Sequence, residues 1–229
     1  SINDRIYECF ILIIKNIFLR VDIIEGRKIR EKENIKDKLL KIKTGGIRDW
    51  RNHNHYNRYE PTPYRSLKAL FKQHQLSEDD HVVDFGSGKG RVVFYLHYKF
   101  NCYVKGIEAN PLTYDEGIEN LHSYLYHKKD YNNRISFKLG TAEGYQVRRE
   151  DNVFYLFHPF SITIFKKVIT NILSSLKEHP RSVTLILFYT ISEYLDFIDN
   201  HTPFVLKMRI KTPNKTDRKQ HFLIYQYEP

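Results

Sequence analysis

From about residue 63 onward, short apolar runs alternate with segments whose apolar residues recur at helical spacing. Short apolar runs predict strands at residues 81–85, 102–108, 135–139, 152–157, 183–189, 204–208 and 222–225. Helical spacing predicts helices at 63–75, 90–99, 111–128, 161–178 and 191–199. The last two strands follow one another without a helix between them. The pattern therefore predicts an α/β fold: a Rossmann-like, doubly wound, mostly parallel seven-stranded sheet with an antiparallel strand near the C-terminus.

The first 46 residues follow a different pattern and predict an N-terminal helical extension. An apolar stripe at helical spacing runs through residues 4–24, and a weaker one, made of Ile35, Leu39 and Ile42, runs through 27–43. Thr44-Gly45-Gly46 breaks the pattern. We therefore divide the chain into an extension, 1–46, and one domain, 47–229.

No segment is long and apolar enough to predict a transmembrane span. The apolar run at residues 9–14 is interrupted by Lys15 and is too short to cross a bilayer. A helix lying on a membrane surface stays an alternative for this region. The two cysteines, Cys9 and Cys102, have no partner nearby in the sequence, so neither a disulfide framework nor a metal site is expected. A cytoplasmic location is the default.

Residues 47–63 are polar and aromatic, contain two prolines and predict a loop. His53 and His55 are two metal-ligand types without a third partner, and solvated loop histidines are the favoured interpretation. Long loops of this composition often close over sites.

The stretch that carries most chemistry is residues 82–91, Val-Val-Asp-Phe-Gly-Ser-Gly-Lys-Gly-Arg. It predicts a strand, a tight glycine turn and a helix N-terminus, which together suit a small-molecule cofactor. The glycines miss the dinucleotide spacing by one position, and the pattern is not a Walker loop. Asp84 before the glycines suits a cationic group, and Glu108 at the end of the next strand suits ribose hydroxyls. A nucleoside carrying an amino acid is favoured over a dinucleotide.

These residues resemble motifs of the class I S-adenosylmethionine-dependent methyltransferases. Residues 82–90 look like the first motif, and Gly106-Ile107-Glu108-Ala109-Asn110 looks like the ribose-binding second motif. Residues 140–143 and 157–160 occupy the positions of the third and fourth motifs. Residues 59–64, Tyr-Glu-Pro-Thr-Pro-Tyr, are similar to the entry segment of an uncharacterised bacterial subgroup.

The resemblance implies the cofactor S-adenosylmethionine and a role for each matching residue. The glycines would pack on its methionine part, Asp84 would receive its ammonium group and Glu108 would hold the ribose. Residues 141–143 would flank the adenine, and residues 158–160 would border the methyl group. The expected cofactor contacts are Asp84, Gly86, Ser87, Gly88, Gly90, Glu108, Ala109, Thr141, Ala142, His158 and Tyr64.

Two positions depart from the family pattern. Thr141 replaces the usual acid, so Glu143 or a backbone carbonyl would have to bind the adenine amino group. His158 replaces the asparagine of amino-methyltransferases and is the candidate general base. Its alternative role is purely structural, either capping the next helix or packing at the sheet edge.

Other residues near the glycines also have two interpretations. Lys89 and Arg91 would attract an acidic substrate or, as we favour, be solvated residues of the first helical turn. Tyr59 and Tyr64 would stack on a ligand or pack in the core.

The formal net charge of +10 makes an anionic partner a candidate. The favoured interpretation of this charge is an ordinary basic surface. A methyltransferase acting on a small molecule or a protein side chain is the first hypothesis. The alternatives are a nucleic-acid (RNA) methyltransferase that uses the basic N-terminal region, or a module that binds S-adenosylmethionine without catalysis. The acceptor cannot be named from these residues.

Overall fold

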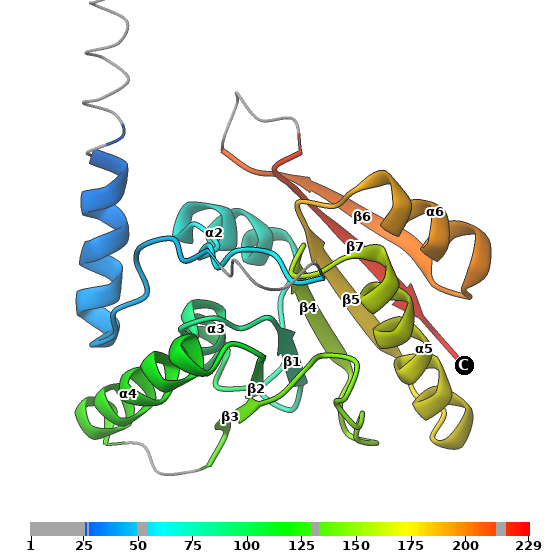
Figure 1. Ribbon diagram of the computed structural model, residues 1–229, viewed down its shortest axis with the longest axis horizontal. Helices are drawn as coiled ribbons and strands as arrows, with labels where there is room; N and C mark the ends of the chain where they lie inside the picture. Colours follow the sequence, from blue (N-terminus) through cyan, green and yellow to red (C-terminus); the bar gives the residue numbers. More distant parts are fainter. Residues whose placement is uncertain (1–25, 27, 50–54, 130–132, 214–218) are drawn as a thin grey trace, which may run out of the picture.

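The computed structural model describes residues 26, 28–49, 55–129, 133–213 and 219–229. A seven-stranded sheet forms its centre, with the strand order β3-β2-β1-β4-β5-β7-β6 (Figure 1). The strands are β1 (His81–Phe85), β2 (Tyr103–Glu108), β3 (Ile135–Leu139), β4 (Val153–Phe157), β5 (Val183–Phe188), β6 (Val205–Lys211) and β7 (His221–Tyr227). Strands β1 to β5 pair in parallel, and β7 lies antiparallel between β5 and β6. The predicted doubly wound sheet with its antiparallel strand is confirmed.

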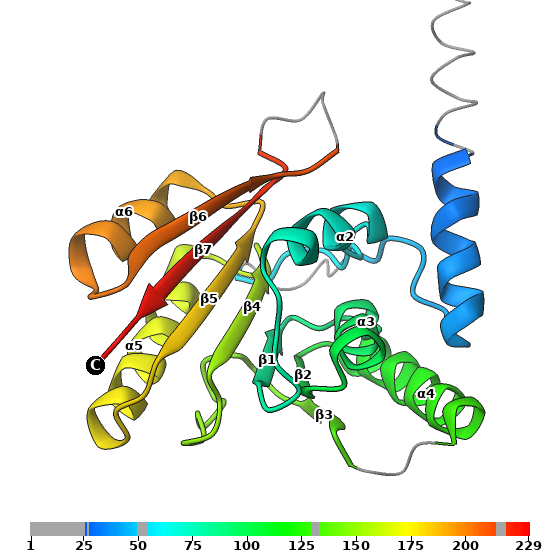
Figure 2. The same cartoon turned by 180° about the vertical axis from the view of Figure 1, so that it is seen from behind.

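Helices cover both faces of the sheet (Figures 1 and 2). The helices are α2 (Tyr64–Gln73), α3 (Arg91–Phe100), α4 (Pro111–Lys128), α5 (Ile162–Glu178) and α6 (Ser192–His201). Residues of α2, α3 and α4 share one buried cluster with one face of the sheet, and α5 and α6 share a second cluster with the other face. The alternation of inward residues along each strand produces these two layers.

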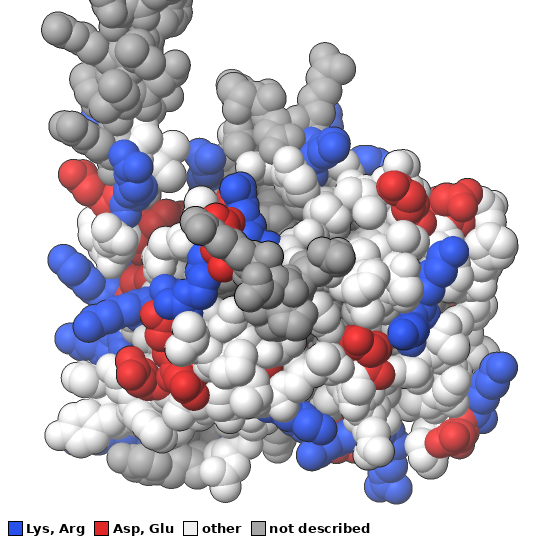
Figure 3. All heavy atoms as spheres, viewed as in Figure 1, with Lys and Arg blue, Asp and Glu red and all other residues white. Residues whose placement is uncertain are grey.

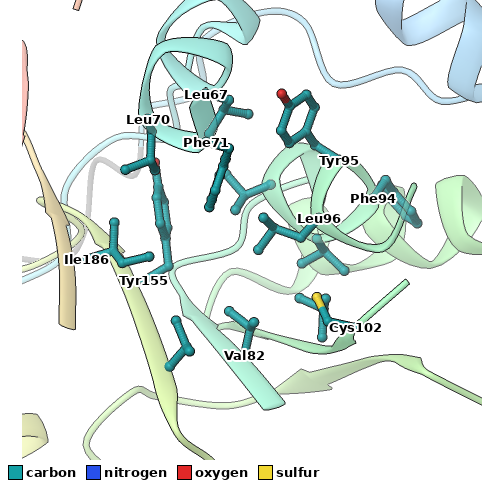
Figure 4. Packing of buried hydrophobic residues seen from close by; sticks show 14 of the residues in the cluster. Leu67, Leu70, Phe71, Val82, Phe94, Tyr95, Leu96, Cys102, Tyr155 and Ile186 are labelled. Carbon is teal, nitrogen blue, oxygen red and sulfur yellow. The ribbon is translucent and has the colours of Figure 1, made fainter. Parts of the chain in front are cut away.

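Aromatic and branched side chains fill the first cluster. Leu67, Leu70 and Phe71 of α2 lie with Tyr155 of β4 and Ile186 of β5, and all five are at most 1% exposed (Figure 4). Leu96 and Phe94 of α3 continue this layer toward Cys102 (Figure 4). This packing fixes the start of α3, and hence the glycine turn, against the carboxyl edge of the sheet.

The N-terminal helix seen in residues 28–40 buries a different face from the predicted one. Ile35 and Leu39 are 64% and 58% exposed, whereas Leu40 and Ile42 are buried. The predicted stripe is wrong at Ile35 and Leu39 and right at Ile42, and polar contacts of Glu33 and Asp37 join this helix to the domain. The stripe predicted in residues 4–24 lies outside the described residues. No helix in the described part of the chain is long and apolar enough to cross a membrane.

Candidate functional site

The glycine turn joins β1 to α3 at the carboxyl edge of the sheet. The amides of Gly86 and Ser87 both donate to the Ile107 carbonyl of β2, at 2.9 and 3.0 Å. Gly88 has a positive φ of 56°, and a methyl group added there would overlap the Tyr59 ring. The turn therefore needs glycine at 88 both for its backbone and for the close approach of Tyr59. The Ser87 side chain is buried and faces Gly106 of β2 rather than solvent.

Glu108 ends β2 and ties the second motif to the turn. One carboxylate oxygen accepts the Gly88 amide at 2.8 Å, and the other accepts the Asn110 amide at 2.8 Å. Glu108 is 8% exposed, and burial raises its pKa although the backbone donors oppose the shift. Each oxygen has a second lone pair, so the carboxylate can still accept from a ligand hydroxyl.

Asp84 lies in β1, two residues before Gly86, and is 3% exposed. Burial raises its pKa well above the ordinary value, and the nearby Glu108 carboxylate raises it further. Two acids buried side by side favour a cationic ligand, because a positive charge would compensate both.

A loop segment closes the site from the outside, and we call residues 55–60 the strap. The Asn57 amide donates to the Pro159 carbonyl at 2.9 Å, and Tyr59 and Arg48 exchange backbone hydrogen bonds at 2.9 and 3.1 Å. The Tyr59 hydroxyl donates to the Thr44 carbonyl at 2.6 Å. The strap thus covers the glycine turn, and closure of this loop over a functional site stays a prediction.

A pocket of about 60 Å³ lies between the strap and the carboxyl edge of β1, β2 and β4. Its walls come from the strap and the strand ends. They include the predicted residues Gly86, Glu108, Ala109 and Ala142, together with Arg48, Tyr56, Asn57, Arg58, Tyr59, Glu60, Ile107, Asn110, Thr113, Gly140, Phe157 and Pro159. Pockets for ligands of nucleoside size begin at roughly 300 Å³. The polar groups fit a nucleoside carrying an amino acid, but the volume fits it only after the strap moves.

Position 141, just after β3, carries Thr where the family pattern has an acid. Thr141 is exposed, while Ala142 beside it is buried and lines the pocket. The Glu143 carboxylate accepts the Tyr56 hydroxyl of the strap at 2.6 Å. Glu143 is therefore engaged by Tyr56, the residue that joins this end of the pocket to the strap.

His158 follows β4 between the lining residues Phe157 and Pro159 but does not itself line the pocket, and its backbone is left-handed, with φ of 36°. Tyr189, after the neighbouring strand β5, is also left-handed, with φ of 57°. Their rings are stacked, 6.4 Å apart at 24°. Burial is the largest cause that lowers the His158 pKa; Lys219 lowers it too, and Glu193 opposes the shift.

The surroundings of Tyr64, Lys89 and Arg91 differ from those that the sequence predicted. Tyr64 donates its hydroxyl to Asp37 at 2.6 Å and lies outside the lining of the pocket. The favoured interpretation of Lys89 and Arg91 as solvated is wrong. Arg91 is 5% exposed and pairs with Glu33 of the N-terminal helix at 2.5 Å, and Lys89 pairs with Glu116 at 3.3 Å. An arginine in this turn is buried because the extension brings carboxylates to it.

Sequence reasoning missed the pocket residues Arg48 and Thr113, and it placed Asn110 in the second motif without naming it as a contact. Asn110 caps α4 by accepting from the Thr113 amide, and Asn before Pro111 is a helix-start signal that pointed to this position. Arg48 had no such signal, because its role depends on an ion pair with Glu116 of α4.

No cluster of three or more metal-ligand side chains occurs among the residues that the structure describes.

Comparison with solved structures identifies the fold. An RNA methyltransferase from Salinibacter ruber in complex with S-adenosylhomocysteine has 16% identity and a TM-score of 0.51, covering 73% of this chain and 92% of its own. A putative methyltransferase, yhhF, from Escherichia coli has 15% identity and a TM-score of 0.54, covering 74% and 87%. A precorrin-6y C5,15-methyltransferase from Geobacter metallireducens has 14% identity and a TM-score of 0.53, covering 74% and 90%.

These similarities show that the chain has the fold of class I S-adenosylmethionine-dependent methyltransferases. The expected fold class is thereby confirmed. No model of a protein family matches the chain, and no curated protein matches it either.

Proposed function

We propose that this protein transfers the methyl group of S-adenosylmethionine to an acceptor at the carboxyl edge of β4 and β5. The observation that carries the proposal is the buried Glu108 carboxylate, which accepts the Gly88 amide in the wall of the pocket. That arrangement joins an acceptor for ribose hydroxyls to a glycine turn that a ligand can approach closely. The Salinibacter ruber neighbour, crystallised with S-adenosylhomocysteine, supports the same ligand here.

Each acid would have a separate task in holding the cofactor. Glu108 would accept from the ribose hydroxyls, and Asp84 would lie toward the ammonium of the amino-acid part. The cofactor, when bound, supplies a methyl group on a positively charged sulfur. Apolar walls such as Phe157 and Pro159 exclude water from the reacting centre, which favours loss of that charge.

The acceptor would lie against the rings of His158 and Tyr189. Thr190, beside Tyr189, is 8% exposed, and its buried hydroxyl has no hydrogen-bond partner among the residues that the structure describes. A neutral His158 would accept a proton from the acceptor if the reacting atom carries one. Positioning the acceptor in line with the methyl group would supply much of the acceleration.

Calorimetric titration with S-adenosylmethionine and S-adenosylhomocysteine tests the cofactor assignment. Wild type should bind both, and Asp84→Ala and Glu108→Ala should each weaken binding at least about tenfold, since hydrogen bonds to charged groups contribute roughly 1.5–3 kcal/mol. Glu119→Ala removes an exposed carboxylate of α4 outside the pocket and should bind like wild type. Thermal denaturation checks that the variants are folded. No binding by wild type would overturn the proposal.

A further inference from the structure

A second and larger cavity lies beside the cofactor pocket, between the N-terminal helix and α4. It measures about 810 Å³, and we call it the lysine groove. Four lysines line it: Lys38 and Lys41 at the end of the helix, Lys43 in the following segment, and Lys89 in the glycine turn. Lys38, Lys41 and Lys43 are exposed. In Figure 3, blue spheres lie on this side of the molecule, below the N-terminal helix, with red spheres between them.

Most acids of the groove are already neutralised by internal partners. Asp37 lies in the buried cluster with Arg91, and Glu116 pairs with both Arg48 and Lys89. Among the described residues, Glu119 is the one lining acid without such an ion pair. No ion pair joins Lys38, Lys41 or Lys43 to a described acid. The groove therefore presents an excess of positive charge, which suits an anionic ligand.

The groove shares a wall with the cofactor pocket. Lys89 lines the groove, and its ammonium lies 5.5 Å from the centre of the Tyr59 ring, which covers the glycine turn. Glu116 lines the groove and pairs with Arg48, which lines the pocket. A long ligand held in the groove would therefore reach the strap and the pocket beneath it.

Exposed aromatic rings lie near lysines at the C-terminal ends of α3 and α4. Tyr98 is 47% exposed, and the ammonium groups of Lys36 and Lys128 lie 5.3 and 5.9 Å from its ring centre. Tyr126, on the last turn of α4, is 72% exposed. Cationic side chains interleaved with exposed aromatic rings are typical of surfaces that bind phosphates and stack bases. An acidic polypeptide would need the cations but not the rings.

We propose that the lysine groove binds the phosphate backbone of a single-stranded nucleic acid and brings it to the cofactor pocket. The groove lysines bind the phosphates, and Tyr98 of α3 and Tyr126 of α4 stack the bases. The claim that the bound strand is the methyl acceptor rests on the function proposed above, whereas the binding itself does not.

Two triple variants with equal loss of charge test the proposal by fluorescence anisotropy. Lys38→Gln, Lys41→Gln and Lys43→Gln remove three cations from the groove. Lys207→Gln, Arg209→Gln and Lys211→Gln remove three exposed cations from β6, on the opposite edge of the sheet. The probes are a labelled 20-nucleotide RNA, DNA of the same sequence, and polyglutamate, in buffers from 50 to 200 mM salt.

We expect wild type to bind the nucleic acids with a steep salt dependence. The groove variant should bind at least tenfold more weakly, and its logarithmic salt slope should be shallower by about 2, since each lost phosphate contact of a single strand removes roughly 0.7. The β6 variant should keep most of the affinity. Equal binding of RNA and DNA would support the proposal, and a preference for one of them would also identify the natural strand.

Three results would overturn it. These are no nucleic-acid binding by wild type at 50 mM salt, an equal loss in both triple variants, or polyglutamate binding that exceeds nucleic-acid binding. Calorimetry with S-adenosylhomocysteine on the groove variant separates the two proposals. If cofactor binding is absent from wild type while nucleic acid still binds in the groove, only the methyltransferase assignment fails.

Discussion

At the scale of single residues, two residues at the carboxyl edge have backbone conformations that non-glycine residues rarely adopt. His158 and Tyr189 are both left-handed, and they stand next to each other where β4 and β5 end. A left-handed non-glycine residue costs free energy, and such residues cluster at functional sites. Two of them at the carboxyl edge mark the place where the acceptor is expected.

The lowered pKa of His158 predicts a pH dependence of stability. The unfolded chain binds a proton on this histidine below its ordinary pKa of about 6.5, whereas the folded chain does so only at lower pH. The folded protein therefore loses stability as the pH falls through this window. His158→Asn, which tolerates a left-handed backbone, should lose less free energy of unfolding between pH 7 and pH 5 than wild type. Urea denaturation at both values measures this.

His122→Asn serves as the control, because His122 is exposed on α4 and away from the carboxyl edge. Its free energy of unfolding should depend on pH as that of wild type does. An unchanged dependence in His158→Asn would contradict the burial of a neutral imidazole.

At the scale of elements, the strap decides whether the pocket is open. Its Tyr59 ring lies on the Gly88 backbone, its hydroxyl is bonded to Thr44, and the pocket beneath measures about 60 Å³. Binding a nucleoside therefore requires the strap to move, and the apparent affinity is reduced by the fraction of molecules in which it is closed.

Tyr59→Phe removes the bond to Thr44 while keeping the ring. Loss of one hydrogen bond of about 1 kcal/mol should raise the population of the open strap, and S-adenosylhomocysteine should bind up to about fivefold more tightly. Calorimetry measures the change, and Tyr126→Phe, at an exposed tyrosine, is the matched control. Weaker binding by Tyr59→Phe would show that the hydroxyl helps to hold the ligand.

At the scale of the whole molecule, the N-terminal helix is attached to the domain by buried charge rather than by an apolar stripe. The Arg91 guanidinium lies 4.5 Å from the Tyr64 ring centre and donates to Glu33 and to Thr44. Burial raises the pKa of Glu33, although Tyr64 and Arg91 oppose the shift. The cluster is satisfied only when the helix, the strap region and α3 are assembled together.

Arg91→Met should therefore be strongly destabilising. It leaves the Glu33 and Asp37 carboxylates without their cation, and breaking a buried pair from one side typically costs about 3–5 kcal/mol. Arg58→Met removes an exposed pair with Glu60 and should cost less than about 1 kcal/mol. Urea denaturation gives both values, and similar values for the two variants would contradict the role of the cluster.

The sequence predicts most of the fold because each strand and helix carries its own period. Runs such as residues 153–157 are apolar throughout, and the glycine turn is local in sequence. Glu108 was found for the same reason, since it ends a recognisable strand. Arg91, Tyr64 and Arg48 were assigned wrongly or missed, because their contacts lie 27 to 68 residues away in the chain. Local periodicity carries no information about such long-range charge pairing.

Arg91 is both the first residue after the glycine turn and the anchor of the helix that contributes Lys38 to the groove. Two binding sites that share one structural anchor are subject to thermodynamic linkage, and linkage is reciprocal. By whatever factor a nucleic acid in the groove changes the affinity for the cofactor, the cofactor changes the affinity for the nucleic acid by the same factor. One guanidinium thus makes cooperativity between the two sites a measurable property of this chain.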